Sequence, residues 1–95
     1  MGSLKTMFKP FDEKVILVFE KHYIKEKGKQ VLNEDGSPRY TLDQFGKVQS
    51  SNIEGINKGD LVIAAPRGGM PIYSEETKKQ VVTIFERPDV YGIKI

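Results

Sequence analysis

The sequence predicts a small all-β protein built as one antiparallel barrel of short strands. No stretch of its 95 residues shows convincing helical periodicity. Short apolar runs rich in branched and aromatic side chains recur at regular intervals, and glycine and proline turns separate them. This combination is typical of small antiparallel barrels. A chain of this length favours a single domain with one modest core.

Two segments are apolar at successive positions, which predicts strands buried on both faces. The first is KVILVFE at 14–20, rich in branched side chains. The second is GDLVIAAP at 59–66, which follows the turn residues Asn57 and Lys58 and ends at Pro66.

Three further strands complete the expected barrel. In RGGMPIY, residues 67–73, two adjacent glycines are expected to supply the positive backbone angles of a tight turn before a short strand. QVVTIFE, residues 80–86, predicts another strand, and a Pro-Asp turn follows it. VYGIKI, residues 90–95, alternates with period two and predicts a strand with one face inward. One of its faces carries Tyr91, Ile93 and Ile95.

The segment 21–42 does not follow the barrel pattern. Eight of its 22 residues are charged and it shows no sustained alternation, yet it contains the isolated apolar pair Val31 and Leu32. A long irregular segment in a compact domain is usually either functional or disordered.

A second interpretation of this segment is an ordinary surface hairpin. Because Asp-Gly is a good hairpin signal, a turn at 35–36 would place Val31 and Leu32 opposite Tyr40 and Leu42.

Composition argues against several classes of function. The chain has no cysteine, so it offers neither a disulfide framework nor a thiolate metal site. Its only histidine, His22, has no visible catalytic partners, and no phosphate-binding glycine motif is present. We therefore expect no enzyme activity and no cofactor. The longest apolar runs, 15–19 and 61–65, are too short for a membrane helix, which predicts no membrane association.

Five motifs in order carry a resemblance to a known family. They are FKPFDEKVILV at 8–18, GKV at 46–48, INKGDLVI at 56–63, PRGGMPI at 66–72 and VVTIFERPDVYGIKI at 81–95. Together they resemble the chaperonin-10 (GroES-type) family of ring-forming co-chaperonins over about three quarters of the chain.

The resemblance implies a GroES-like barrel over 8–95. Residues 1–7 would form an N-terminal extension, in which MGS looks like a cloning scar. The segment from about 21 to 42 would be a mobile loop, disordered when free, that binds a chaperonin ring. The matching loop positions are Gly28, Lys29, Gln30, Val31 and Leu32. Because Gln30 replaces the first apolar residue of the family motif, the apolar hook is shorter here.

The family also implies a seven-membered ring in which the N-terminal strand of one subunit pairs with the C-terminal strand of the next. The matching interface positions are Phe8, Lys9, Pro10, Phe11, Tyr91, Ile93 and Ile95. The alternative is that both edges belong to one barrel and the protein is a monomer.

The chain departs from the family pattern at two further places, and the second, a short roof interval, makes it resemble phage-encoded members. Arg67 replaces the tyrosine of the family's Tyr-Gly-Gly turn, and the interval 49–58 is too short for the hairpin that roofs the dome in bacterial members. The implied function is a lid with a reduced roof that encloses client proteins, while the chaperonin hydrolyses ATP. The expected location is the cytoplasm of a bacterium or of a phage-infected host.

A different class remains open, a monomeric OB- or SH3-like barrel that binds single-stranded nucleic acid. Tyr23 and Tyr40 could stack on bases, and the lysines at 25, 27 and 29 could contact phosphates. A net charge of only +2, without a dense basic stripe, makes nucleic acid the less expected partner.

Overall fold

The computed structural model describes residues 10–65 and 68–95, and this part of the chain is mostly antiparallel β-structure with loops and almost no helix. Its strands are β1 (Lys14–Tyr23), β2 (Lys25–Glu26), β3 (Lys29–Gln30), β4 (Tyr40–Leu42), β5 (Gly46–Ser51), β6 (Leu61–Ala64), β7 (Met70–Pro71), β8 (Gln80–Glu86) and β9 (Val90–Ile93). Two single 3₁₀ turns, η1 (Tyr73–Glu75) and η2 (Arg87–Asp89), connect strands. No helix in the described ranges is long and apolar enough to cross a membrane.

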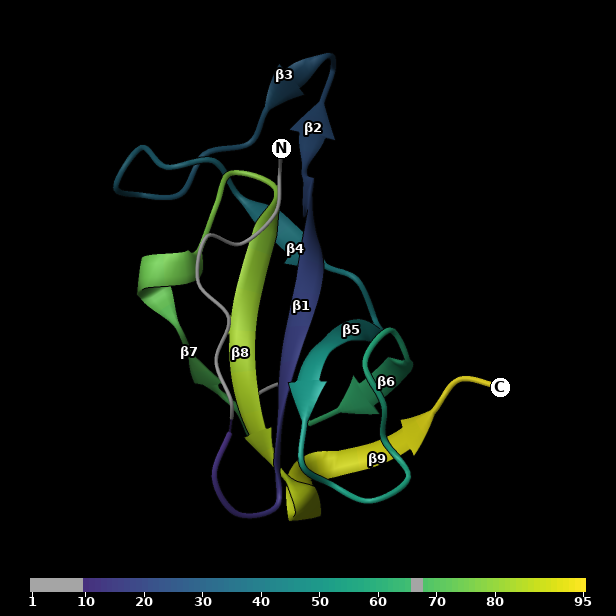
Figure 1. The fold of residues 1–95 in the computed structure, drawn as a ribbon. Helices are drawn as coiled ribbons and strands as arrows, with labels where there is room; N and C mark the ends of the chain where they lie inside the picture. Colours follow the sequence, from purple (N-terminus) through teal and green to yellow (C-terminus); the bar gives the residue numbers. More distant parts are fainter. Residues whose placement is uncertain (1–9, 66–67) are drawn as a thin grey trace.

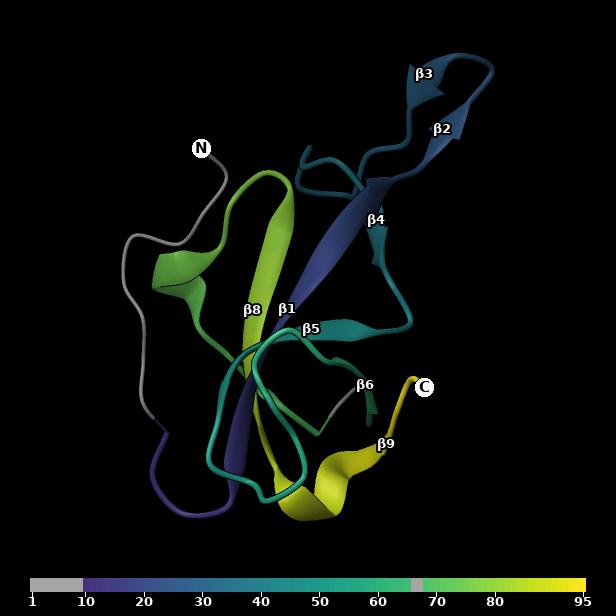
Figure 2. The same ribbon diagram turned by 45° about the vertical axis from the view of Figure 1, so that its right-hand side comes forward.

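One antiparallel sheet forms the body of the protein. Its strands follow the order β7-β8-β1-β5-β6-β9, and β4 pairs with the far end of β1. The sheet curls into a half-barrel, with β7 at one edge and β9 at the other (Figures 1 and 2). The expected small antiparallel all-β fold is thereby confirmed.

Strand β1 is the centre of the sheet because its sequence is apolar on both faces. Val15, Ile16 and Leu17 are all fully buried, so successive side chains on opposite faces both lie away from solvent. β8 pairs along most of β1, and β5 pairs on its other side with an irregularity between Ile16 and Leu17. The predicted two-face burial of this strand is confirmed.

The largest group of buried side chains lies inside the curl of the sheet. Its members are Val15, Leu17, Phe19, Val48, Ile53, Ile56, Val62 and Phe85, and Ala64 and Val90 pack against it. Phe19 and Phe85 meet edge to face with ring centroids 6.0 Å apart. Since each fully buried aliphatic or aromatic side chain contributes about 1.5–3 kcal/mol, this one core supplies the main stabilisation of the body.

The glycine pair before β7 has a different role from the one predicted. Neither Gly68 nor Gly69 has a backbone angle in the left-handed region. A Cβ atom on Gly69 would instead lie 2.3 Å from Thr83 Cγ2, and one on Gly68 would lie 2.7 Å from Asp89 Cγ. The pair is glycine because the backbone packs directly against β8 and η2, and the expectation of a positive-angle turn was wrong.

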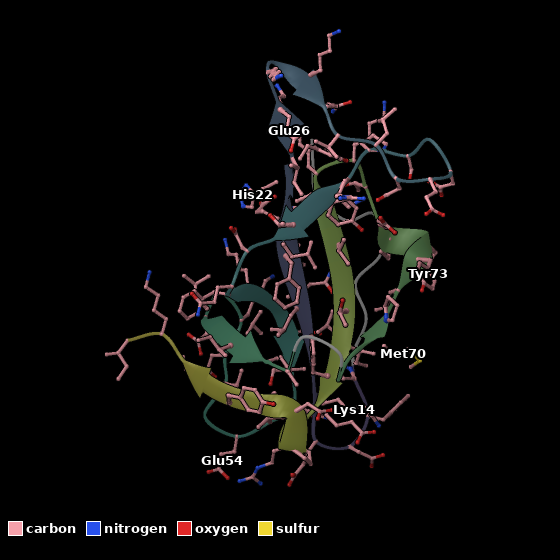
Figure 3. All side chains as sticks on the ribbon, turned by 180° about the vertical axis from the view of Figure 1, so that it is seen from behind. Lys14, His22, Glu26, Glu54, Met70 and Tyr73 are labelled. Atoms are coloured by element: carbon pink, nitrogen blue, oxygen red, sulfur yellow. The ribbon has the colours of Figure 1, made fainter. Side chains whose placement is uncertain are left out.

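Between the end of β1 and the start of β4 the chain forms a projection that we call the arm, residues 24–39. It carries the small β2–β3 hairpin and a second turn, and it protrudes from one end of a molecule of 45 × 27 × 23 Å (Figure 1). Figure 3 shows Glu26 on the arm and Glu54 at the opposite end of the molecule.

Candidate partner-binding arm

Three backbone hydrogen bonds close the base of the arm. The N–H of Ile24 donates to the carbonyl of Arg39, and the N–H of Val31 donates to the carbonyl of Ile24. The N–H of Arg39 in turn donates to the carbonyl of Val31. These three residues, which we call the neck, divide the arm into two separate loops, 25–30 and 32–38.

The first loop of the arm is a two-residue hairpin. Glu26 pairs with Lys29, and the turn between them consists of Lys27 at φ 50° and Gly28 at φ 78°. Two successive positive angles define a type I′ turn, whose twist matches that of paired strands. The preferred first residue in this turn is asparagine, aspartate or glycine, so Lys27 is an unusual occupant.

Side chains organise the second loop. The N–H of Gly36 donates to the carbonyl of Asn33, and Gly36 adopts a positive φ of 86°. The Asp35 carboxylate accepts hydrogen bonds from both the hydroxyl and the N–H of Ser37, and these bonds lower the pKa of Asp35 below its ordinary value. Arg39 Nε donates to the Asn33 side chain. The loop therefore has a defined conformation held by short-range bonds.

The two members of the apolar pair occupy different environments. Val31 lies in the neck and is half-buried, whereas Leu32 lies just beyond it with 53% of its surface exposed. Leu32 forms an isolated bridge with Pro38. Of the two, only Leu32 is largely exposed at the surface of the arm, while Val31 holds its base together.

The surface-hairpin interpretation placed its turn correctly and its register wrongly. The chain does reverse at 33–36, but Leu32 lies opposite Pro38 and not opposite Tyr40 or Leu42. Those two residues pair with Tyr23 and Lys21 of β1. The tight turn fixes the nearer pairing, which leaves the residues after Arg39 free to join the main sheet.

The other residues assigned to the mobile loop lie in the β2–β3 hairpin. Gly28 forms the second turn position, while Lys29 and Gln30 form β3 and are exposed. They are separated from Leu32 by the neck, so the five matched positions do not form one continuous surface. The sequence offered a weak signal for this hairpin, a glycine preceded by lysine, which is not a typical I′ pair.

A cluster of side chains at the base of the arm joins the ends of β1 and β4 to the segment between β7 and β8. Lys21 Nζ lies 2.5 Å from Glu76 Oε1 and 4.6 Å from the centre of the Tyr40 ring. Tyr40 meets Tyr23 edge to face, and the Tyr23 hydroxyl donates to the carbonyl of Lys78. Sequence reasoning missed this cluster because its members are up to 57 positions apart and share no motif.

Some of the predicted interface residues lie outside the described part of the chain, and the others lie within it. Phe8 and Lys9 lie outside the described residues, as does Arg67. Pro10 is buried, and its carbonyl accepts a hydrogen bond from the Asn52 amide.

The remaining interface positions are exposed in the single chain. Phe11 and Tyr91 are strongly exposed, with 69% of the Tyr91 surface open to solvent, whereas Ile93 is 38% exposed. A register irregularity between Ile63 and Ala64 places Ile93 opposite the buried Val62, so Tyr91 and Ile93 do not share one outward face as simple alternation predicted. The described part of the structure pairs β9 with β6 alone, so its other edge is open. Val90 provides the inward face of this strand, and the exposed residues are Phe11, Tyr91, Ile93 and Ile95.

The structure places few chemically reactive groups together. His22 pairs with Asp43 at the base of the arm, and both side chains are exposed. Within 10–65 and 68–95, no group of three or more histidine or acidic side chains could hold a metal ion.

Comparisons with protein-family models, with curated proteins and with solved structures each find no match to this chain.

Proposed function

We propose that this protein is a co-chaperonin-type lid, a homo-oligomeric ring whose arms capture a chaperonin ring. The observation that carries the proposal is the arm, which projects from one end of the body and exposes Leu32 at a folded turn. The order of the five sequence motifs gives independent support. In this proposal the ring closes over client proteins in the cytoplasm of a bacterium or of its phage-infected host, and the chaperonin performs the ATP hydrolysis.

The energetics favour a multivalent arrangement. Full burial of one leucine side chain yields about 1.5–3 kcal/mol. Ordering of a flexible segment on binding costs about 2–5 kcal/mol, so one arm alone would bind weakly. If the arm binds in the conformation seen here, the hydrogen bonds of the neck and of the second loop would reduce that cost. Several arms on one ring multiply the affinity by roughly a hundredfold to ten-thousandfold.

The sheet edge supports assembly into a ring. An open edge strand tends to recruit another chain through its unpaired backbone groups. β9 combines such an edge with the exposed apolar side chains Tyr91 and Ile93, and Ile95, just beyond the strand, is also exposed. The strand lies far from the arm tip in Figure 1, so assembly through β9 would leave the arms free to bind.

The first test compares two leucines of similar exposure. Leu32→Asp places a charge on the proposed hook, whereas Leu42→Asp places the same charge on β4, outside the arm, where the leucine is 41% exposed. Since every 1.4 kcal/mol changes affinity tenfold, we expect Leu32→Asp to weaken capture by a purified bacterial chaperonin ring with ADP at least tenfold. The measurement is native-gel or sedimentation analysis of the complex.

The Leu42→Asp variant is expected to bind like the unmodified protein. Full capture by Leu32→Asp would show that the arm does not bind through this residue and would remove the basis of the lid proposal.

The structure gives less support to the nucleic-acid alternative. Base stacking needs available ring faces, but Tyr23 and Tyr40 are half-buried against each other and Tyr40 also faces Lys21. The exposed lysines of the β2–β3 hairpin remain in its favour. A single-strand binder would lose affinity steeply as salt rises.

A further inference from the structure

The β2–β3 hairpin at the end of the arm carries a concentrated positive charge. Lys25, Lys27 and Lys29 are exposed, and Glu26 is the one acidic residue between them, so six residues hold a net charge of +2 (three positive, one negative). Among the ion pairs of the described residues, none involves these lysines. The charge is therefore available to a partner.

The tip lysine occupies a turn position that its residue type does not favour. Lys27 adopts φ 50°, a left-handed angle that strongly favours glycine, asparagine or aspartate in this turn type. A lysine at a backbone angle that disfavours it, in an exposed turn, points to a role for its side chain. Among the described residues, β2 and β3 pair only with each other and not with a strand of the main sheet.

We propose that this hairpin is a second docking element of the arm and that it recognises an acidic surface on the protein partner. The inference rests on the proposed lid function and deepens it. The partner site would combine an apolar pocket for Leu32 with carboxylates beside it that face the three lysines. Because these lysines are solvent-exposed, their charge mainly accelerates association and makes it sensitive to salt.

The experiment compares four proteins: the unmodified chain, Lys27→Asn, the triple variant Lys25→Gln/Lys27→Asn/Lys29→Gln, and the control Lys58→Asn. Lys58 is an exposed lysine in the turn between β5 and β6, on the body. The probe is a purified bacterial chaperonin ring with ADP, and the association rate is measured at about 50 mM and about 300 mM salt, where screening differs strongly.

We expect the triple variant to associate about tenfold more slowly at low salt and to lose most of the salt dependence. Lys27→Asn improves the turn, so it should leave the hairpin amide signals in NMR spectra intact or sharper while slowing association two- to threefold. Lys58→Asn should behave like the unmodified chain. This divergence between hairpin order and association separates a binding role from a folding role.

Two outcomes would overturn the inference in different ways. If the chaperonin captures the unmodified chain and the triple variant equally fast, the lysine hairpin is not a docking element, but the lid proposal stands. If the chaperonin captures none of the proteins, the lid proposal fails and this inference fails with it. Tight binding of single-stranded oligothymidine that is lost in the triple variant would assign the lysines to nucleic acid instead.

Discussion

Lys21 lies near the end of β1, at the base of the arm, and its charged side chain is nearly buried there. Its side chain is only 7% exposed, whereas that of its partner Glu76 is 32% exposed. The Tyr40 ring covers the ammonium group on another side, with its centre 4.6 Å from Lys21 Nζ, in a cation–π arrangement. The two partners of this ion pair are therefore not equivalent, because one keeps contact with water and the other does not.

This asymmetry gives a prediction for two substitutions. Glu76→Gln leaves the Lys21 ammonium nearly buried without its counter-charge and should lower the free energy of unfolding by about 1.5–3 kcal/mol. Lys21→Met leaves only a partly solvated carboxylate and keeps the apolar stem, so it should cost under about 1 kcal/mol. Urea unfolding of both variants measures the difference. Equal losses, or a larger loss in Lys21→Met, would contradict this account.

The sequence did not reveal how the environments of individual residues differ where those environments depend on partners far away in the chain. It identified Val31 and Leu32 as an unusual apolar pair but treated them alike. Their difference arises because Val31 bonds to both Ile24 and Arg39, a contact that local sequence does not reveal. The cluster around Lys21 was unpredictable for the same reason.

Among the elements, β5 depends on a glycine for its approach to β1. A Cβ atom on Gly46 would lie 2.8 Å from Phe19 Cζ and 2.9 Å from Leu17 Cβ, both in the core. Gly46→Ala would therefore force the core side chains or the strand to move.

We expect Gly46→Ala to reduce the free energy of unfolding by about 1–3 kcal/mol, the usual range for overpacking. Lys47→Ala, at the exposed neighbouring position of the same strand, should change it by less than about 0.5 kcal/mol. Chemical denaturation of the two variants provides the comparison. A neutral Gly46→Ala would mean that the core yields at this point more easily than its packing indicates.

The long strands were predictable, whereas the short strands β2, β3 and β4 were not. β1 and β8 are runs of branched and aromatic residues, and burial on one or both faces makes such runs recognisable. β2, β3 and β4 contain two or three residues each, and pairing rather than composition defines them. Gly68 and Gly69 show the limit of turn chemistry, since close packing against Asp89 and Thr83 also selects glycine.

For the whole molecule, the main prediction concerns its assembly. If the exposed apolar side chains and the open edge of β9 join neighbouring subunits, the native mass at micromolar concentration should be about 76 kDa, that is, seven chains of 10.8 kDa. Ile93→Asp should reduce this species to the monomer, because a charge on the buried part of an interface is strongly unfavourable. Sedimentation velocity measures both masses.

Ser50→Asp, on β5 away from β9, provides a variant with the same added charge that should keep the oligomer. A chain that stays monomeric at high concentration would remove the multivalency on which the lid proposal depends.

The overall class of fold was predictable because strand-forming runs and turn residues are local features. The oligomeric state depends on which surfaces stay exposed, and that required the arrangement of the strands.

The neck gives the arm a modular construction. The bond between Val31 and Ile24 closes the loop 25–30, and the bond between Arg39 and Val31 closes the loop 32–38, so Val31 is the one residue that both closures share. Residues can be inserted or exchanged in the first loop without a change in the path of the second. If the arm binds a partner as proposed, the charged hairpin can change its sequence without altering the turn that exposes Leu32.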